Sequence, residues 1–298
     1  MIPIVQNRRI WLTCSGILVA ASIVALGLWQ LRLGIDFTGG SLLEIVYTAE
    51  RPPMEEVRAR LGDAGIAEAD IKPVGDREAN IRLGDVSQGM YAKIIEELRK
   101  DDPELVQKSF QSIGPVIGQE LKKKSLLALA VALAMILLYI TYVFRKVSYP
   151  VESWKYGIAA IVALFHDAVI VLGVFAALGY FFSIEITSSF IPAFLTVLGF
   201  SVHDTIVIFD RIRENLQKTR GEFALTVNQA LNQTLVRSIN TSMTVLLVLF
   251  ALYFFGGDTL KTFSLALIIG VAIGTYSSIF VAAPFLTVWH AFMHRARR

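Results

Sequence analysis

The segment SLLALAVALAMILLYITYVF, residues 125–144, contains twenty residues and no charged side chain. About twenty apolar residues in a helix are enough to cross the hydrocarbon core of a bilayer. Five further long apolar runs lie at residues 10–31, 156–182, 188–209, 238–255 and 260–291. The sequence therefore predicts a polytopic α-helical membrane protein with six transmembrane helices.

The composition excludes an ordinary soluble protein. Hydrophobic residues make up 54% of the 298 residues and charged residues 18%, with a mean hydropathy of +0.57, whereas soluble domains carry about a quarter charged residues. A net charge of +3 is too small to indicate a nucleic-acid partner. The single cysteine, Cys14, cannot form an internal disulfide, and the spacing of zinc ligands is absent. We expect no metal and no cofactor.

Basic residues between the apolar runs predict the orientation of the chain. The first run lacks a clear signal-peptidase site, so we interpret residues 1–31 as a short N-terminal segment and a retained signal-anchor helix. If the spans alternate, most basic residues fall on one side: Arg8, Arg9, Arg145, Lys146, Lys155, Arg211, Arg213, Lys218, Arg220, Arg237, Arg295, Arg297 and Arg298. The positive-inside rule places this side, with both termini, in the cytoplasm. Lys122, Lys123 and Lys124 lie on the other side, within a long translocated segment where the rule is weak.

Residues 32–124 have the composition of a soluble domain and separate the first span from the five spans in residues 125–298. Alternating and β-branched residues predict strands at 41–49, 71–74, 79–83 and 105–113, and helical spacing predicts helices at 54–61 and 88–100. The order β-α-β-β-α-β suggests a ferredoxin-like α+β domain. We expect a binding or mechanical role, because this segment shows no catalytic cluster.

Two predicted spans carry a carboxylate at membrane depth, where an ionised side chain costs roughly 2.5–3.5 kcal/mol on insertion scales. The third span contains His166 and Asp167, and the fourth contains His203 and Asp204. One polar stripe follows the helical spacing of the fourth span: Ser201, Asp204 and Thr205. Such costly groups are usually functional, so we expect them to serve ion movement.

A second polar stripe opens the fifth predicted span. Its members recur at helical spacing: Arg237, Asn240, Thr241 and Thr244. Antiparallel neighbouring spans would bring Asp204 and Arg237 toward the same side of the membrane, where the two could meet. The structural alternatives are a static buried ion pair and an arginine that reaches the membrane interface. A pair that makes and breaks contact would bind and release a proton, and sodium is the other candidate ion.

The last predicted span has a face of small residues: Gly270, Gly274, Ser277 and Ser278. The G-x-x-x-G spacing on this face predicts a close approach of a neighbouring helix. We expect this face to serve packing alone.

Four segments carry a resemblance to a known family. They are GIDFTGG at 34–40, FHD at 165–167, VHDTIVIFDRIREN at 202–215 and RSINTS at 237–242. In order and spacing, over essentially the whole chain, they resemble the SecF family, the smaller half of the SecDF accessory factors of protein translocation in the RND superfamily. His203 departs from the family pattern, in which an asparagine or another small polar residue is expected before the aspartate.

The resemblance implies a bacterial inner-membrane protein with residues 32–124 in the periplasm. It also implies a non-enzymatic role in Sec-dependent export that uses the proton motive force. A SecD-like subunit, the SecYEG translocon, YajC, translocating preproteins and membrane lipid are the implied partners. By motif position, Asp204 and Arg237 match the family's proton-relay aspartate and arginine. Asp167 joins them in the predicted relay because of its own place in a span.

The GIDFTGG segment predicts a tight connection between the first span and the domain that follows. Gly34, Gly39 and Gly40 allow backbone conformations that are closed to other residues. The segment lacks the Gly-Lys-Ser/Thr ending of a phosphate loop. We therefore interpret Asp36 as a residue of the turn or of an interdomain hydrogen bond.

Two other functions compete with protein export. A half-size RND-type exporter of small hydrophobic molecules would need a large apolar substrate cavity. An intramembrane protease would need paired catalytic side chains, and Asp167 with Asp204 is a conceivable pair. The G-x-G-D context of aspartyl intramembrane proteases is, however, missing from the sequence.

Overall fold

The computed structural model describes residues 1–66, 68–145, 152–218 and 221–296. The chain divides into two compact units, of which one combines Met1–Arg32 with Leu127–Arg298 and the other is Leu33–Leu126. Four of the basic residues used to predict the orientation lie outside the described residues: Lys146, Arg220, Arg297 and Arg298.

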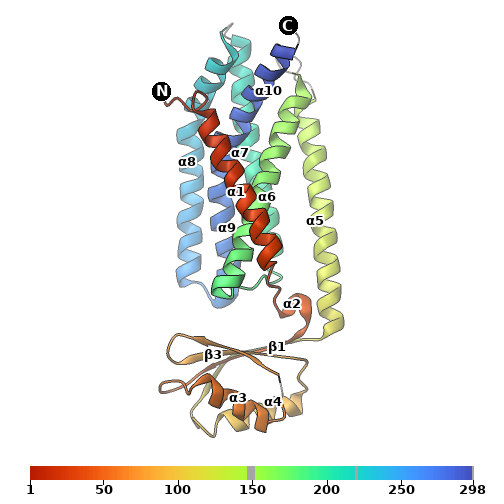
Figure 1. Ribbon diagram of the computed structural model, residues 1–298, viewed down its shortest axis with the longest axis vertical. Helices are drawn as coiled ribbons and strands as arrows, with labels where there is room; N and C mark the ends of the chain where they lie inside the picture. The colour runs from red at the N-terminus through yellow and green to blue at the C-terminus, as the bar shows by residue number, and fades with distance from the viewer. Residues whose placement is uncertain (67, 146–151, 219–220, 297–298) are drawn as a thin grey trace. The chain divides into compact units, whose positions relative to one another are not determined.

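The prediction of six spanning helices is confirmed. Among the described residues, six helices are long and apolar enough to cross a membrane (Figure 1). They are α1 (Arg8–Trp29), α5 (Pro115–Phe144), α6 (Ser153–Phe182), α7 (Phe190–Lys218), α8 (Phe223–Phe255) and a last span formed by α9 (Asp258–Ser277), η1 (Ser278–Ala282) and α10 (Ala283–Ala296).

Three helices extend well beyond the apolar runs that predicted them. Helix α5 begins at Pro115 instead of Ser125, α7 continues to Lys218, and α8 begins at Phe223 instead of Ser238. Hydropathy detects only the apolar part of a helix, whereas backbone hydrogen bonding continues through polar residues that favour helix. As a consequence, Arg237 lies about four turns inside α8 and does not open it.

Helices α6, α7 and α9 form the packed centre of the membrane unit, and α5 stands at its edge (Figure 1). Helices α7 and α9 approach closely because α9 presents glycines. A Cβ on Gly270 would lie 2.1 Å from Val197 Cγ2, and one on Gly274 would lie 3.0 Å from Ser201 Cβ. The predicted packing role of this glycine face therefore has a defined partner in α7.

The other unit contains a four-stranded sheet in the order β2-β3-β1-β4, in which every neighbouring pair is antiparallel. Its elements are β1 (Gly40–Val46), α3 (Met54–Asp63), β2 (Asp70–Val74), β3 (Glu78–Leu83), α4 (Gln88–Leu98) and β4 (Val106–Ile113). This sheet order is that of the predicted ferredoxin-like unit, and α3 and α4 lie on one face of the sheet (Figure 1).

Alternating residues of this sheet build a separate apolar core. Ile45, Ile81 and Leu98 are each 0% exposed within it. At its edge, the backbone N–H of Thr48 donates to Asp102 Oδ2 at 2.6 Å. This hydrogen bond holds the pKa of the Asp102 carboxyl below its usual range.

The GIDFTGG segment forms the one-turn helix α2 (Ile35–Thr38), the glycine that follows it, Gly39, and the first residue of β1, Gly40. Gly39 and Gly40 have φ values of 74° and 114°. A Cβ on Gly39 would lie 2.7 Å from Pro115 Cα, and one on Gly40 would lie 2.7 Å from Leu83 O. Both the backbone conformation and the close approach therefore exclude larger residues.

Candidate functional site

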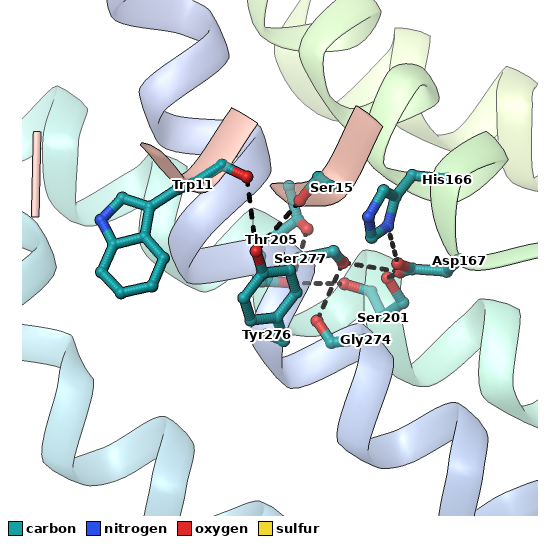
Figure 2. A network of polar contacts seen from close by, with 10 residues as sticks. Trp11, Ser15, His166, Asp167, Ser201, Thr205, Gly274, Tyr276 and Ser277 are labelled. Carbon is teal, nitrogen blue, oxygen red and sulfur yellow. Dashed lines mark hydrogen bonds and ion pairs between the residues drawn. The ribbon is translucent and has the colours of Figure 1, made fainter. Parts of the chain in front are cut away.

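Asp167 is the most enclosed carboxylate of the membrane unit, with 0% of its surface exposed. Its Oδ1 accepts a hydrogen bond from His166 Nδ1 at 2.9 Å. Its Oδ2 accepts from Ser277 Oγ at 2.7 Å and also from Ser201 Oγ (Figure 2). Residues from α6, α7 and α9 thus surround one carboxylate and occupy both of its oxygens.

The serines that hold this cluster lie where α9 passes into the π-helix η1. Ser277 is the last residue of α9 and Ser278 the first of η1. The Oγ of Ser278 lies 2.8 Å from Thr205 Oγ1 and donates to Ser201 O at 3.3 Å. Ser277 and Ser278 therefore form hydrogen bonds across the helix interface in addition to packing there. A π-turn, which often marks a functional site, brings two successive hydroxyls to α7.

Asp204 is held in a different way. Its Oδ1 accepts a hydrogen bond from Ser238 Oγ of α8 at 2.8 Å. Its Oδ2 is buried and has no hydrogen-bond partner among the described residues. Ser201, which donates to Asp167, lies one turn before Asp204 on α7. The two carboxylates are therefore linked through one helix face.

The structure does not contain the expected contact between Asp204 and Arg237. Within the described part of the chain, no ion pair or hydrogen bond joins the two side chains. Arg237 is exposed and lines a cavity beside α7, and the rest of its predicted stripe is also exposed: Asn240, Thr241 and Thr244. The polar residues that α8 turns inward are instead Ser238 and Ser242.

Hydroxyl groups continue from these carboxylates along the helix interfaces. Ser242 Oγ lies 2.5 Å from Thr275 Oγ1 of α9. Thr205 and Ser278 form a second such pair between α7 and η1. A hydroxyl both donates and accepts a hydrogen bond, so each of these pairs can pass a proton over a short step or offer oxygen ligands to a small cation. Among the described residues, no continuous series of side-chain hydrogen bonds joins Asp167 to Asp204.

A polar cavity of about 410 Å³ opens beside α7 and α8. Its lining includes Arg211, Arg213 and Arg237 together with Asp210 and Glu214. Arg211 pairs with Glu214 at 2.6 Å. The cavity places water-accessible charges next to the helix pair that holds Asp204, since Arg237 is the neighbour of Ser238 in sequence.

The remaining predicted residues are less central. His203 is exposed on the outer side of α7, so it is not part of the buried face. Asp36 is half-buried within α2, in the other unit. Among the described residues, no group of three or more His, Cys, Asp or Glu side chains could hold a metal ion.

Sequence reasoning missed several members of the buried network. Ser238, Ser242, Thr275 and Tyr276 were not expected to take part. Ser238 and Ser242 recur four residues apart, which is a usable signal, but the stripe that begins at Arg237 has the same spacing on another face. Only helix packing distinguishes the two faces.

Together, the fold and this network define a polytopic membrane protein that carries ionisable groups inside its helix bundle. The model of the family described as "Protein export membrane protein SecD/SecF, C-terminal" matches residues 93–291, and that of the "SecD/SecF GG Motif" matches residues 30–49. Because full-length curated relatives agree with these matches, the chain belongs to the SecF family of protein translocase subunits.

The curated relatives cover nearly the whole chain. The protein translocase subunit SecF of Thermobaculum terrenum is 46% identical over 97% of this chain and 94% of its own length. The SecF subunit of Pseudomonas aeruginosa is 39% identical over 90% of this chain and 85% of its own length.

Solved structures agree with the fold. The crystal structure of SecDF, a translocon-associated membrane protein from Thermus thermophilus, matches 96% of this chain with a TM-score of 0.83 and 33% identity. A crystal structure of SecDF in a super-membrane-facing form matches 99% of this chain with a TM-score of 0.70 and 32% identity. This chain spans only 38% and 39% of those two chains.

Proposed function

We propose that this chain is the SecF-type subunit of a SecD–SecF complex that assists protein translocation across the bacterial inner membrane. The observation that carries the proposal is a pair of buried carboxylates, Asp167 and Asp204, held by hydroxyls inside a chain of the SecF family. We propose that ion movement through these groups drives the work on the preprotein. No covalent chemistry on the preprotein is needed, so the proposed role is non-enzymatic.

The exposed polar edge of α8 supports a SecD-like partner. Asn240, Thr241 and Thr244 are exposed within a membrane-spanning helix and do not line the cavity that holds Arg237. Polar and ionisable side chains that face lipid are costly, and they usually face protein or a water-filled cavity. A second membrane subunit that covers this edge would remove the cost. Arg237 lines the polar cavity and precedes Ser238, the partner of Asp204, so it is placed to respond to the ion state of Asp204.

An export assay tests the proposed coupling. Asp204→Asn is expected to abolish gradient-dependent stimulation of preprotein translocation in vesicles that contain the SecD-like subunit, SecYEG and this chain. Asp85→Asn is the control, because it makes the same change at an exposed position of the other unit, outside the candidate site. Unchanged stimulation with Asp204→Asn, at normal levels of the complex, would contradict the relay.

The coupling ion is tested in the same vesicles. We propose that the ion is the proton. The hydroxyls and the carboxylates already form hydrogen bonds with one another, so Oδ2 of Asp204 is the carboxylate oxygen of Asp167 and Asp204 that has no partner among the described residues. One such oxygen is enough to bind a proton, whereas a sodium ion needs several oxygen ligands. A pH gradient in sodium-free buffer should sustain stimulation, and a sodium gradient alone should not. The reverse result would assign the carboxylates to sodium.

The orientation is also a proposal: both termini in the cytoplasm and residues 32–124 in the periplasm. In a Cys14→Ser background, a cysteine at exposed Asp85 should react with an impermeant maleimide in spheroplasts. A cysteine at exposed Gln217 should react only after permeabilisation. The opposite pattern would invert the topology. Copurification with the SecYEG translocon and YajC tests the wider set of partners.

The half-size exporter and the intramembrane protease receive no support from the relatives, which are named as translocase subunits. Incubation of the purified complex with a membrane-embedded peptide should give no cleavage. Specific cleavage that Asp167→Asn abolishes would favour the protease instead.

A further inference from the structure

His166 is a buried histidine with one unexplained nitrogen. The residue is 4% exposed, and its Nδ1 lies 2.9 Å from Asp167 Oδ1. Its Nε2 is buried and has no hydrogen-bond partner among the described residues. An imidazole that donates from Nδ1 to a carboxylate carries a lone pair on Nε2 when it is neutral. A buried polar atom without a partner calls for an explanation.

The net charge of the His166–Asp167 pair inside the membrane unit gives the Nε2 lone pair a role. The ionised Asp167 with a neutral His166 has a net charge of minus one in a position with 0% exposure. One added proton on Nε2 forms an imidazolium and makes the pair neutral overall. The oxygens of Asp167 already accept three hydrogen bonds, so Nε2 is the open proton acceptor of the cluster.

We propose that His166 and Asp167 form a proton-binding dyad, in which His166 Nε2 takes up the proton and Asp167 is the fixed counter-ion. The inference rests on the proposed ion-coupled function and adds a second proton site to Asp204. The dyad cycles between imidazole–carboxylate and imidazolium–carboxylate, and the Nδ1–H bond to Asp167 is kept in both states. Proton uptake therefore requires no rearrangement of the serines that hold Asp167.

Among the described residues, Asp167 is the charged side chain in hydrogen-bonding or ring contact with His166. The ring of His166 stacks on Tyr276 of α9 at a centroid distance of 6.3 Å. The hydroxyl of Tyr276 lies 3.1 Å from Ser15 Oγ and donates to Trp11 O of α1 at 3.4 Å (Figure 2). Helix α7 contributes Ser201, and η1 and residues 283–289 of α10 contain no ionisable side chain. Within the described residues, Asp167 and Tyr276 are the titratable groups in these contacts of His166.

The alternative explanation is that His166 only positions Asp167. The two roles make different demands on the side chain. An asparagine amide can occupy the place of Nδ1–H and donate to Asp167, but it has no equivalent of Nε2. His166→Asn therefore keeps the positioning contact and removes the proposed proton site. His166→Leu removes both.

The first test compares these variants in the full complex with its SecD-like subunit. If the dyad binds a proton, His166→Asn reduces gradient-dependent translocation to the level seen without a gradient, as His166→Leu does. His290→Asn, a histidine change on α10 outside the network, retains stimulation. If His166→Asn works like the unsubstituted protein while His166→Leu fails, the residue only positions Asp167 and the proposal is overturned.

The second test observes the proton directly and does not depend on transport. The full complex, labelled with ¹⁵N in its histidine rings, is measured by solid-state NMR in lipid between about pH 5 and 9, the range in which histidine changes charge. The signal that His166→Asn removes should move from a lone-pair to a protonated Nε2 within this range. An Nε2 signal that stays neutral throughout the range contradicts the dyad.

The failure of this inference can be distinguished from the failure of the proposed function. Loss of stimulation in Asp204→Asn but not in His166→Asn leaves the coupling intact and removes only the second site. Full stimulation in both variants removes the coupling itself.

Discussion

The two carboxylates of the membrane unit are held in contrasting ways. Asp167 is 0% exposed and accepts hydrogen bonds at both oxygens from three side chains. Asp204 is 9% exposed, accepts one hydrogen bond from Ser238 and leaves one oxygen without a partner among the described residues. A carboxylate whose oxygens all accept hydrogen bonds is part of the helix packing. A carboxylate with one oxygen that lacks a partner can change its hydrogen bonds at a small cost in free energy. The bundle thus combines a fixed site with an adaptable one.

Removal of the fixed carboxylate should give the largest loss of stability. Asp167→Leu leaves His166 and Ser201 as buried donors without their acceptor, at about 1–3 kcal/mol for each group that finds no new partner, whereas Ser277 retains Gly274 O at 3.1 Å. Asp204→Leu leaves only the Ser238 hydroxyl without its acceptor. Thermal unfolding in detergent, followed by tryptophan fluorescence, should therefore show a much lower Tm for Asp167→Leu than for Asp204→Leu. An equal or reversed order would remove the contrast between the sites.

Substitution in the glycine face that brings α9 against α7 should give the second-largest loss of stability. Gly270→Ala places a Cβ 2.1 Å from Val197 Cγ2 and should cost about 1–3 kcal/mol through overpacking. Gly199→Ala is the matched control, because a Cβ there meets nothing within 4 Å. The same unfolding assay should show a lower Tm for the first variant only. If Gly270→Ala is neutral, close helix approach does not hold the two carboxylate sites together.

The loss of the single hydrogen bond of Asp204 should lower the stability by less. Ser238→Ala removes it and is expected to cost about 1 kcal/mol. Thr241→Ala, on the exposed face of the same helix, should leave the Tm unchanged. A loss in Ser238→Ala as large as that in Asp167→Leu would show that Asp204 is also a structural group.

Arg237 should have the smallest effect on the stability of the isolated chain and a full effect on function. Arg237→Met should change stability by less than about 0.5 kcal/mol, because its side chain is exposed and has no ion pair among the described residues. It should abolish stimulation and weaken copurification with the SecD-like subunit. A large drop in the Tm of the isolated chain would instead place Arg237 within the fold of this subunit.

Much of the architecture follows from local sequence patterns. Long apolar runs predicted all six spans, and alternation predicted the strands of the small domain within a few residues. The lengths of α5 and α8 did not follow, because polar residues continue a helix without an apolar signal. The π-turn at Ser278 also left no local signal, since its residues are as apolar as those of an ordinary helix.

The candidate site divides in the same way. The sequence alone identified the two carboxylates of the candidate site, Asp167 and Asp204, because a carboxylate is rare at membrane depth. Their hydrogen-bond partners could not be predicted from the sequence. The expected partner of Asp204 was Arg237, yet the structure gives it Ser238, and the less prominent Asp167 receives three donors.

The sequence by itself determined the number of spans, the order of the small domain and the presence of ionisable groups in the membrane. These properties depend on hydrophobicity and periodicity along one segment at a time. The tertiary structure alone decided which face of α8 turns inward, which serines reach Asp167 and which oxygen of Asp204 stays open. Those choices depend on how α6, α7, α8 and α9 rotate against one another, and the glycines of α9 that set this rotation act only when α7 is beside them.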